Sequence, residues 1–186
     1  MKIHGGEQMA GRKYVSDYRI EKAITPSGKV ETKLFYQGVY YRYEKPRDEI
    51  LRLRKHVLLI TILAALLICP LFTTAAMLSH TMYVVLPAAF SLIPMYLLLA
   101  GARRLGFGEE KFTREHRDKT EKRIARGSLW LTIILGLAVV GSVVYICLMP
   151  VILEEYLCMA SLLLAFAGSV TLLPHRKKAK AVEAEK

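Results

Sequence analysis

Charged residues are missing from four long apolar runs of this 186-residue chain. The runs cover residues 57–79, 82–102, 129–149 and 156–173, and none contains Asp, Glu, Lys or Arg. Each run is long enough to cross a hydrocarbon core, which needs about 20 residues at 1.5 Å per residue. Because a proton- or cation-coupled carrier usually holds its ion at a carboxylate within the membrane, the missing acids argue against that class.

Lys and Arg are also missing from the two short connections between the runs, around His80 and around Glu154. All twenty-seven lie elsewhere: thirteen before the first run, nine in the loop 103–127 and five after residue 173. Cytoplasmic loops retain Lys and Arg during insertion. The sequence therefore predicts an all-α membrane protein, a four-helix transmembrane bundle of two helical hairpins. We expect it in the bacterial cytoplasmic membrane, with both termini in the cytoplasm.

The chain divides by composition into five expected segments. A cytoplasmic N-terminal segment is followed by a juxtamembrane helix and the first hairpin, a basic helical loop, the second hairpin and a basic tail, which we expect to end in a short disordered stub. Their bounds are 1–45, 46–102, 103–128, 129–173 and 174–186. Pro46 opens the juxtamembrane helix, as proline does at a first helical position, and Thr113 caps a helix over residues 114–126.

Motifs for catalysis, metals and cofactors are lacking as well. No CxxC, HExxH or phosphate-binding glycine pattern occurs, and the five histidines are dispersed along the chain. We therefore expect no enzyme activity, no metal and no cofactor. Cys147 and Cys158 flank the second outer connection, so a bridge between them is conceivable, but free buried thiols are the default. The net charge of +11 is explained by topology and by anionic headgroups rather than by nucleic acid.

What the N-terminal segment does contain is alternating aromatic and β-branched residues. Residues 14–24 and 30–41 are predicted to pair as a β-hairpin about the turn Pro26–Gly28, with Gly38 as a bulge or as the end of the second strand. An isolated hairpin is marginal in water and must pack on something. The candidate partner-binding residues are its aromatic side chains: Phe35, Tyr36, Tyr40 and Tyr41.

Prolines and small residues are the remaining features of the apolar runs. Pro70 and Pro94 are expected to kink two adjacent helices at similar depth. The kinks indicate either ordinary packing, which membrane helices tolerate, or a hinge. A stripe of Ser161, Ala165 and Ser169 would let helix backbones approach closely, and we favour a contact within the bundle over one between subunits.

The outer connections carry two acids, Glu154 and Glu155, which we interpret as marking a solvated turn. The sequence thus favours a non-enzymatic accessory or scaffold subunit of a membrane complex, whose partners are anionic lipid and other membrane subunits. The main alternative is a small uncoupled transporter or channel built around the proline-kinked hairpin. A lipid enzyme using acids of 109–118 ranks below both, because those acids suit i,i+4 pairs with Lys and Arg.

Overall fold

The computed structural model describes residues 14, 17–24, 30–73, 80–105, 112–150, 152–177 and 181–184. It divides into two compact units. Unit 1 comprises Met1–Glu44, Gly108–Asp118 and Ala181–Lys186, and unit 2 comprises Lys45–Phe107 and Lys119–Lys180. Unit 1 is therefore assembled from three separate stretches of the chain.

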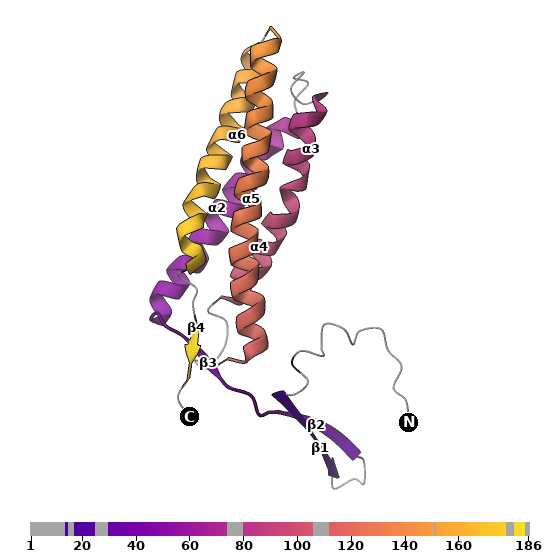
Figure 1. Ribbon diagram of the computed structural model, residues 1–186, viewed down its shortest axis with the longest axis vertical. Coiled ribbons are helices and arrows are strands. Elements are labelled where there is room, and N and C mark those ends of the chain that lie inside the picture. Colours follow the sequence, from indigo (N-terminus) through magenta and orange to yellow (C-terminus); the bar gives the residue numbers. More distant parts are fainter. Residues whose placement is uncertain are drawn as a thin grey trace. The chain divides into compact units, whose positions relative to one another are not determined.

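Helix α2 (Arg47–Thr73) opens unit 2 and runs without a break from the charged juxtamembrane stretch into the first apolar run (Figure 1). Backbone N–H groups of Glu49 and Ile50 donate to the carbonyl of Pro46, so the helix begins where the proline predicted. Asp48 and Glu49 lie in the first turn, where the helix dipole favours negative charge. The prediction of one continuous juxtamembrane and apolar helix is confirmed.

The second apolar run forms two helices, α3 (Met82–Phe90) and α4 (Leu92–Arg104), which are separated by a break at Ser91. Pro94 accounts for this break, because it lacks an N–H for the carbonyl of Phe90 and its ring crowds that carbonyl. The Ser91 side chain donates to the carbonyl of Ala88 at 2.6 Å. Helix α2, by contrast, continues through Pro70.

The second hairpin consists of α5 (Arg114–Leu148), α6 (Leu153–Leu172) and a terminal 3-10 turn, η3 (Leu173–Lys177). Helix α5 joins the expected loop helix and the third apolar run into one 35-residue element. The two connecting residues, Gly127 and Ser128, include no proline that would end the helix. Thr113 Oγ1 accepts the N–H of His116 at 3.4 Å, which is the cap expected at this position.

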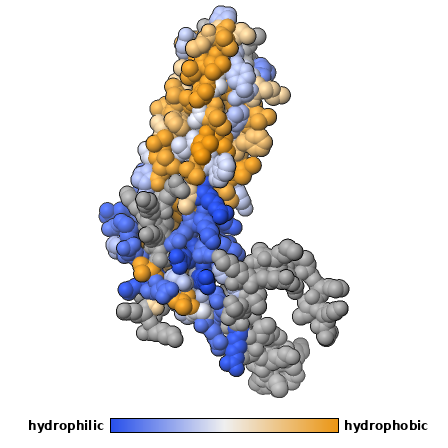
Figure 2. All heavy atoms as spheres, in the orientation of Figure 1, coloured by the Kyte–Doolittle hydropathy of each residue, from blue (hydrophilic) through white to orange (hydrophobic). Residues whose placement is uncertain are grey.

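The helices of unit 2 pack as a four-membered bundle. Helix α2 packs against α6 and α4. Helix α5 lies against α6 where Gly136 meets Phe166, and against α3 and α4 at Gly141 and Gly127. Four helical stretches are long and apolar enough to cross a membrane, which confirms the coarse fold class. In Figure 2 hydrophobic residues dominate the visible face of the helical bundle. Large apolar side chains such as Leu59, Tyr96 and Leu157 are exposed.

In unit 1, strand β1 (Tyr18–Ile24) pairs antiparallel with β2 (Val30–Tyr36), so that Tyr18 faces Tyr36 and Ile24 faces Val30. This confirms a hairpin in the N-terminal segment, although its turn, Pro26–Gly28, lies outside the described residues. The second strand ends at Tyr36, earlier than the predicted residue 41. At Gly38 an added Cβ would lie 2.6 Å from the Tyr36 hydroxyl oxygen, so the chain folds back tightly there.

The predicted end of the second strand belongs to a different sheet. Strand β3 (Tyr41–Tyr43) pairs antiparallel with β4 (Ala181–Glu183) from the C-terminal tail. The prediction of a disordered tail is therefore wrong for these residues. On β3's other side, Tyr41 and Phe112 exchange two backbone hydrogen bonds of 2.8 Å. A three-residue strand is too short to show alternation, and its partners lie about 70 and about 140 positions away in the chain. For both reasons the sequence does not reveal it.

Candidate functional site

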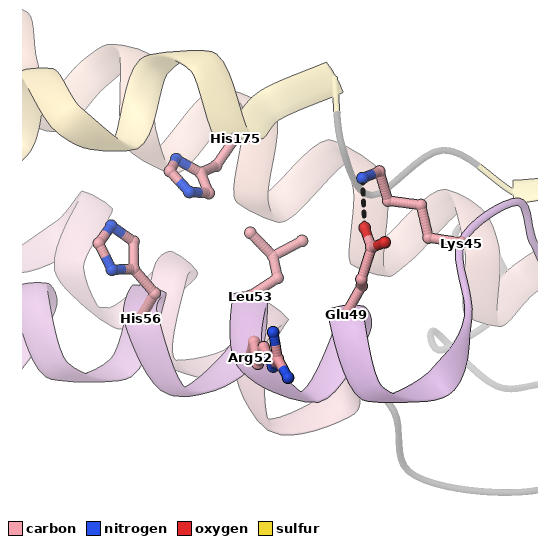
Figure 3. Close-up of a pocket in the computed structure, with 6 residues that line it drawn as sticks. All are labelled: Lys45, Glu49, Arg52, Leu53, His56 and His175. Carbon is pink, nitrogen blue, oxygen red and sulfur yellow. Dashed lines mark hydrogen bonds and ion pairs between the residues drawn. The ribbon is translucent and has the colours of Figure 1, made fainter.

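A pocket of about 440 Å³ opens in unit 2 between the start of α2 and the end of the fourth helical stretch. Four of its six lining side chains carry a cation or an imidazole, Leu53 is buried, and one is acidic (Figure 3). The lining residues are Lys45, Glu49, Arg52, Leu53, His56 and His175. All but His175 come from the first ten residues at the N-terminal end of α2 or immediately before it.

Two histidines from distant parts of the chain meet at this pocket. The rings of His56 on α2 and His175 on η3 stack with centroids 4.7 Å apart and planes inclined by 25° (Figure 3). Nδ1 of His175 lies 2.9 Å from the carbonyl oxygen of Thr171. Because a carbonyl can only accept, this nitrogen carries the proton. Nε2 of His56 is buried and has no hydrogen-bond partner in the described part of the chain.

Charges around the histidines are mixed but mainly positive. Lys45 pairs with Glu49, one helical turn away, and both side chains are partly exposed. Arg52 adds a second cation without a second carboxylate. Because Lys45 is paired with Glu49, Arg52 gives the lining a net positive charge that attracts an anion, and arginine is a usual partner of phosphate. The pocket is therefore suited chemically to a small anionic group.

Sequence reasoning missed this pocket because its residues carry no motif. His56 and His175 are separated by more than a hundred residues, and each looks like an isolated histidine. Their meeting depends on the packing of α2 against α6. The sequence offered one signal, which is the position of the two histidines. His56 comes just before the first apolar run and His175 just after the fourth, so both lie at the same end of the bundle.

Many of the Ser and Thr hydroxyl groups of unit 2 serve the helices themselves. Each of six Ser and Thr side chains donates to a backbone carbonyl three or four residues earlier in its own helix, a common way to satisfy a hydroxyl in an apolar surrounding. They are Thr61, Thr73, Ser91, Thr132, Ser142 and Ser161. Thr132 also reaches across to the carbonyl of Ser169 at 3.2 Å, and this bond links α5 to α6.

The predicted hinge and packing residues are spread over the bundle. Pro94 is buried in α4 near the break at Ser91, whereas Pro70 is half-buried within α2. Ala165 and Ser169 are buried, and Ser161 is half-buried. Neighbouring Gly168 would place a Cβ 3.6 Å from Ile60 of α2. A hinge at the prolines and a packing role for the stripe stay predictions.

The predicted aromatic partner residues fall into different environments within unit 1. Tyr41 is buried under the Arg117 guanidinium, whose carbon lies 4.6 Å from the ring centroid. The Tyr36 hydroxyl accepts the N–H of Arg114 at 3.1 Å and donates to the carbonyl of Val39. The Phe35 side chain lies outside what the structure describes. Tyr40, which is 42% exposed, is the member that presents its ring to the surroundings.

Glu155 contradicts the expectation that both acids mark a solvated turn. It is 2% exposed, whereas its neighbour Glu154 is exposed. The Tyr145 hydroxyl donates to Glu155 Oε1 at 2.8 Å, and the N–H of Ile152 donates to Oε2 at 3.0 Å. Since Ile152 has no side-chain acceptor to cap α6, this carboxyl group supplies both the cap and a link to α5. The fourth helix therefore contains a buried acid, Glu155, whereas the sequence predicted that this residue would precede the helix in a solvated turn.

No family model, curated protein or solved structure matches this chain.

Proposed function

We propose that this chain is an integral membrane protein that acts without catalysing a reaction, as an accessory or scaffold subunit of a larger membrane complex. The proposal is carried by the construction of unit 1. Strand β3 joins β4 from the tail on one side and Phe112 from the middle loop on the other. Three separate segments are thereby ordered into one body, an arrangement that has an entropic cost and suits a docking platform.

Tyr40 is the residue of this platform that we expect to contact a partner protein. Its ring stacks edge-on against Tyr36 at 5.1 Å, which holds it in place while leaving it exposed. Val39 beside it is 49% exposed. Rigid, partly exposed tyrosines are enriched among residues that dominate binding energy, so a partner subunit is expected to cover this pair.

A pull-down tests this role. Membranes are cross-linked lightly, and the tagged full chain is then purified in mild detergent. We expect one partner at fixed stoichiometry, and we expect Tyr40→Ala to weaken its binding about 5- to 30-fold, as a loss of about 1–2 kcal/mol would. Tyr156→Ala is the matched control, because Tyr156 is similarly exposed but lies on α6. Recovery of the monomer alone, from cross-linked membranes too, would contradict the accessory role.

The orientation that goes with this role is cytoplasmic for both termini and for unit 1, in a bacterial cytoplasmic membrane. It is supported by the absence of Lys and Arg in the connections around His80 and Glu154 and by nine in the loop 103–127. In a chain whose three cysteines are replaced by serine, a cysteine at position 80 should react with an impermeant maleimide from outside. A cysteine at position 115 should react only after permeabilisation, and the reverse pattern would overturn the orientation.

The alternative is a small uncoupled transporter or channel. The observation that favours it is the break at Ser91, next to buried Pro94, in a span that packs against Pro70-containing α2. Broken helices in membrane proteins can line a path for solutes. Flux of ions or small metabolites into proteoliposomes, above that of empty vesicles and lost on Pro94→Ala, would decide for this alternative.

A further inference from the structure

We propose that the pocket lined by Arg52, His56 and His175 is a binding site for a phosphate group, carried either by an anionic lipid headgroup or by a soluble phosphate compound. The proposal concerns a ligand and is independent of the partner role of unit 1. Only the lipid source rests on the placement of the bundle in a membrane.

The charge and geometry of the pocket lining support this proposal. Arg52 offers a planar fork of donors that matches two phosphate oxygens. Lys45 and Glu49 are paired with each other, so the net positive charge of the lining comes from Arg52. The pocket volume of about 440 Å³ lies within the range typical of small-molecule sites.

The second argument comes from the two imidazoles. Nε2 of His56 is buried without a partner, and a buried polar atom in this state calls for one. His175 uses Nδ1 on the Thr171 carbonyl, so its Nε2 can donate to an anion only when the ring is cationic. Two stacked cationic rings would repel each other at 4.7 Å, and a phosphate beside them would offset that repulsion. A phosphate would therefore give the buried Nε2 of His56 a hydrogen-bond partner.

The depth of Arg52 and His56 along α2 supports a lipid source for the phosphate. The apolar run begins at Val57, so His56 is at its edge and Arg52 lies about 7.5 Å before it at 1.5 Å per residue. The headgroup layer on each side of a bilayer is about 5–7 Å thick. His56 and Arg52 therefore bracket the level of lipid phosphates, which favours a lipid headgroup as the natural source.

Binding is measured on the purified full chain in an uncharged detergent by native mass spectrometry. Phosphatidylglycerol is titrated as the lipid phosphate, diacylglycerol as the lipid without phosphate, and inorganic phosphate as the soluble source. We expect phosphatidylglycerol to be retained and diacylglycerol not. We expect Arg52→Gln and His175→Gln to lower the affinity at least tenfold. Lys55→Gln and His80→Gln, which remove a cation and an imidazole outside the pocket, should change it less than threefold.

The possible outcomes distinguish a lipid phosphate from a soluble phosphate compound, and some of them would overturn the proposal. Arg52-dependent binding of inorganic phosphate, with no preference for phosphatidylglycerol over diacylglycerol, would assign the site to a soluble phosphate compound. Equal losses in the Arg52 and Lys55 variants, or no binding of either phosphate source, would overturn the proposal. If Arg52→Gln does not fold, the wild-type chain still decides: bound phosphate should slow modification of His175 by diethyl pyrocarbonate and leave His80 unaffected. Unchanged modification of His175 would likewise overturn it.

Discussion

Replacing Glu155 with alanine is expected to lower the free energy of unfolding by about 2–4 kcal/mol, because the buried carboxyl group accepts two hydrogen bonds that no other side chain can replace. The change leaves the buried Tyr145 hydroxyl without its acceptor, at a residue that is 4% exposed. It also takes the acceptor from the N–H of Ile152. It also removes the cap of α6. Equilibrium unfolding of the purified protein in detergent, followed by circular dichroism, measures the loss.

Glu154→Ala is the matched control, since Glu154 is the adjacent residue, carries the same group and is exposed. It should change the stability by less than about 0.5 kcal/mol. Tyr145→Phe should reproduce only part of the Glu155→Ala loss, because it removes one of the two bonds. The double variant should be less destabilised than the sum of the single variants. Equal effects of Glu154→Ala and Glu155→Ala would show that the acid is solvated, as the sequence analysis assumed.

Glu155 could have been recognised from the spacing of buried residues. On α6 the buried positions are Glu155, Cys158, Leu162, Ala165, Ser169 and Leu172, which follow an alternating step of three and four. The packing stripe predicted from the sequence was instead Ser161, Ala165 and Ser169, at steps of four. A strict step of four drifts around an α-helix, so Ser161 falls beside the buried face. Extending the three-four pattern backwards from Cys158 reaches Glu155.

The same pattern on α5 explains why Tyr145 meets this acid. Its buried positions step by three and four from Leu131 through Leu135, Ala138 and Ser142 to Tyr145. Two facing stripes of this kind pack side by side, so the members nearest the turn between the helices come together. Tyr145 is the last member of the stripe on α5, and Glu155 is the first member of the stripe on α6, so these two residues meet at the turn. Hydropathy alone predicted the four apolar helices. Predicting which face of each helix is buried requires the alternating three- and four-residue spacing.

The pairing of β3 and the histidine pocket were beyond sequence reasoning for a different reason. Hydropathy and alternation report local order, and the hairpin of β1 and β2 was found in this way. The pairing of Tyr41 with Phe112 and with the strand at Glu183 joins segments that lie far apart in the sequence. Likewise, His56 and His175 become a pair only through helix packing. One sequence contains no signal of such distant contacts.

Replacing Gly141 with alanine is expected to destabilise the bundle by about 1–3 kcal/mol relative to the same change at Gly168. At Gly141 an added Cβ would lie 2.9 Å from the carbonyl oxygen of Tyr83 and 3.3 Å from Val84 Cγ2. A backbone oxygen of α3 cannot rotate away, so α3 and α5 must separate. Val84 is fully buried, and its packing would be lost with that separation.

Gly168→Ala isolates this steric effect. Both glycines lie inside helices, so both changes gain the same helix propensity, about 1 kcal/mol in water. The Cβ at residue 168 would meet Ile60 at 3.6 Å, an ordinary van der Waals contact, so this variant should be as stable as the wild type or more so. The difference in unfolding free energy between the two variants then measures the close approach alone. If both variants unfolded together, α3 and α5 would have room between them, and the glycine would not be what lets the broken second span pack against the third.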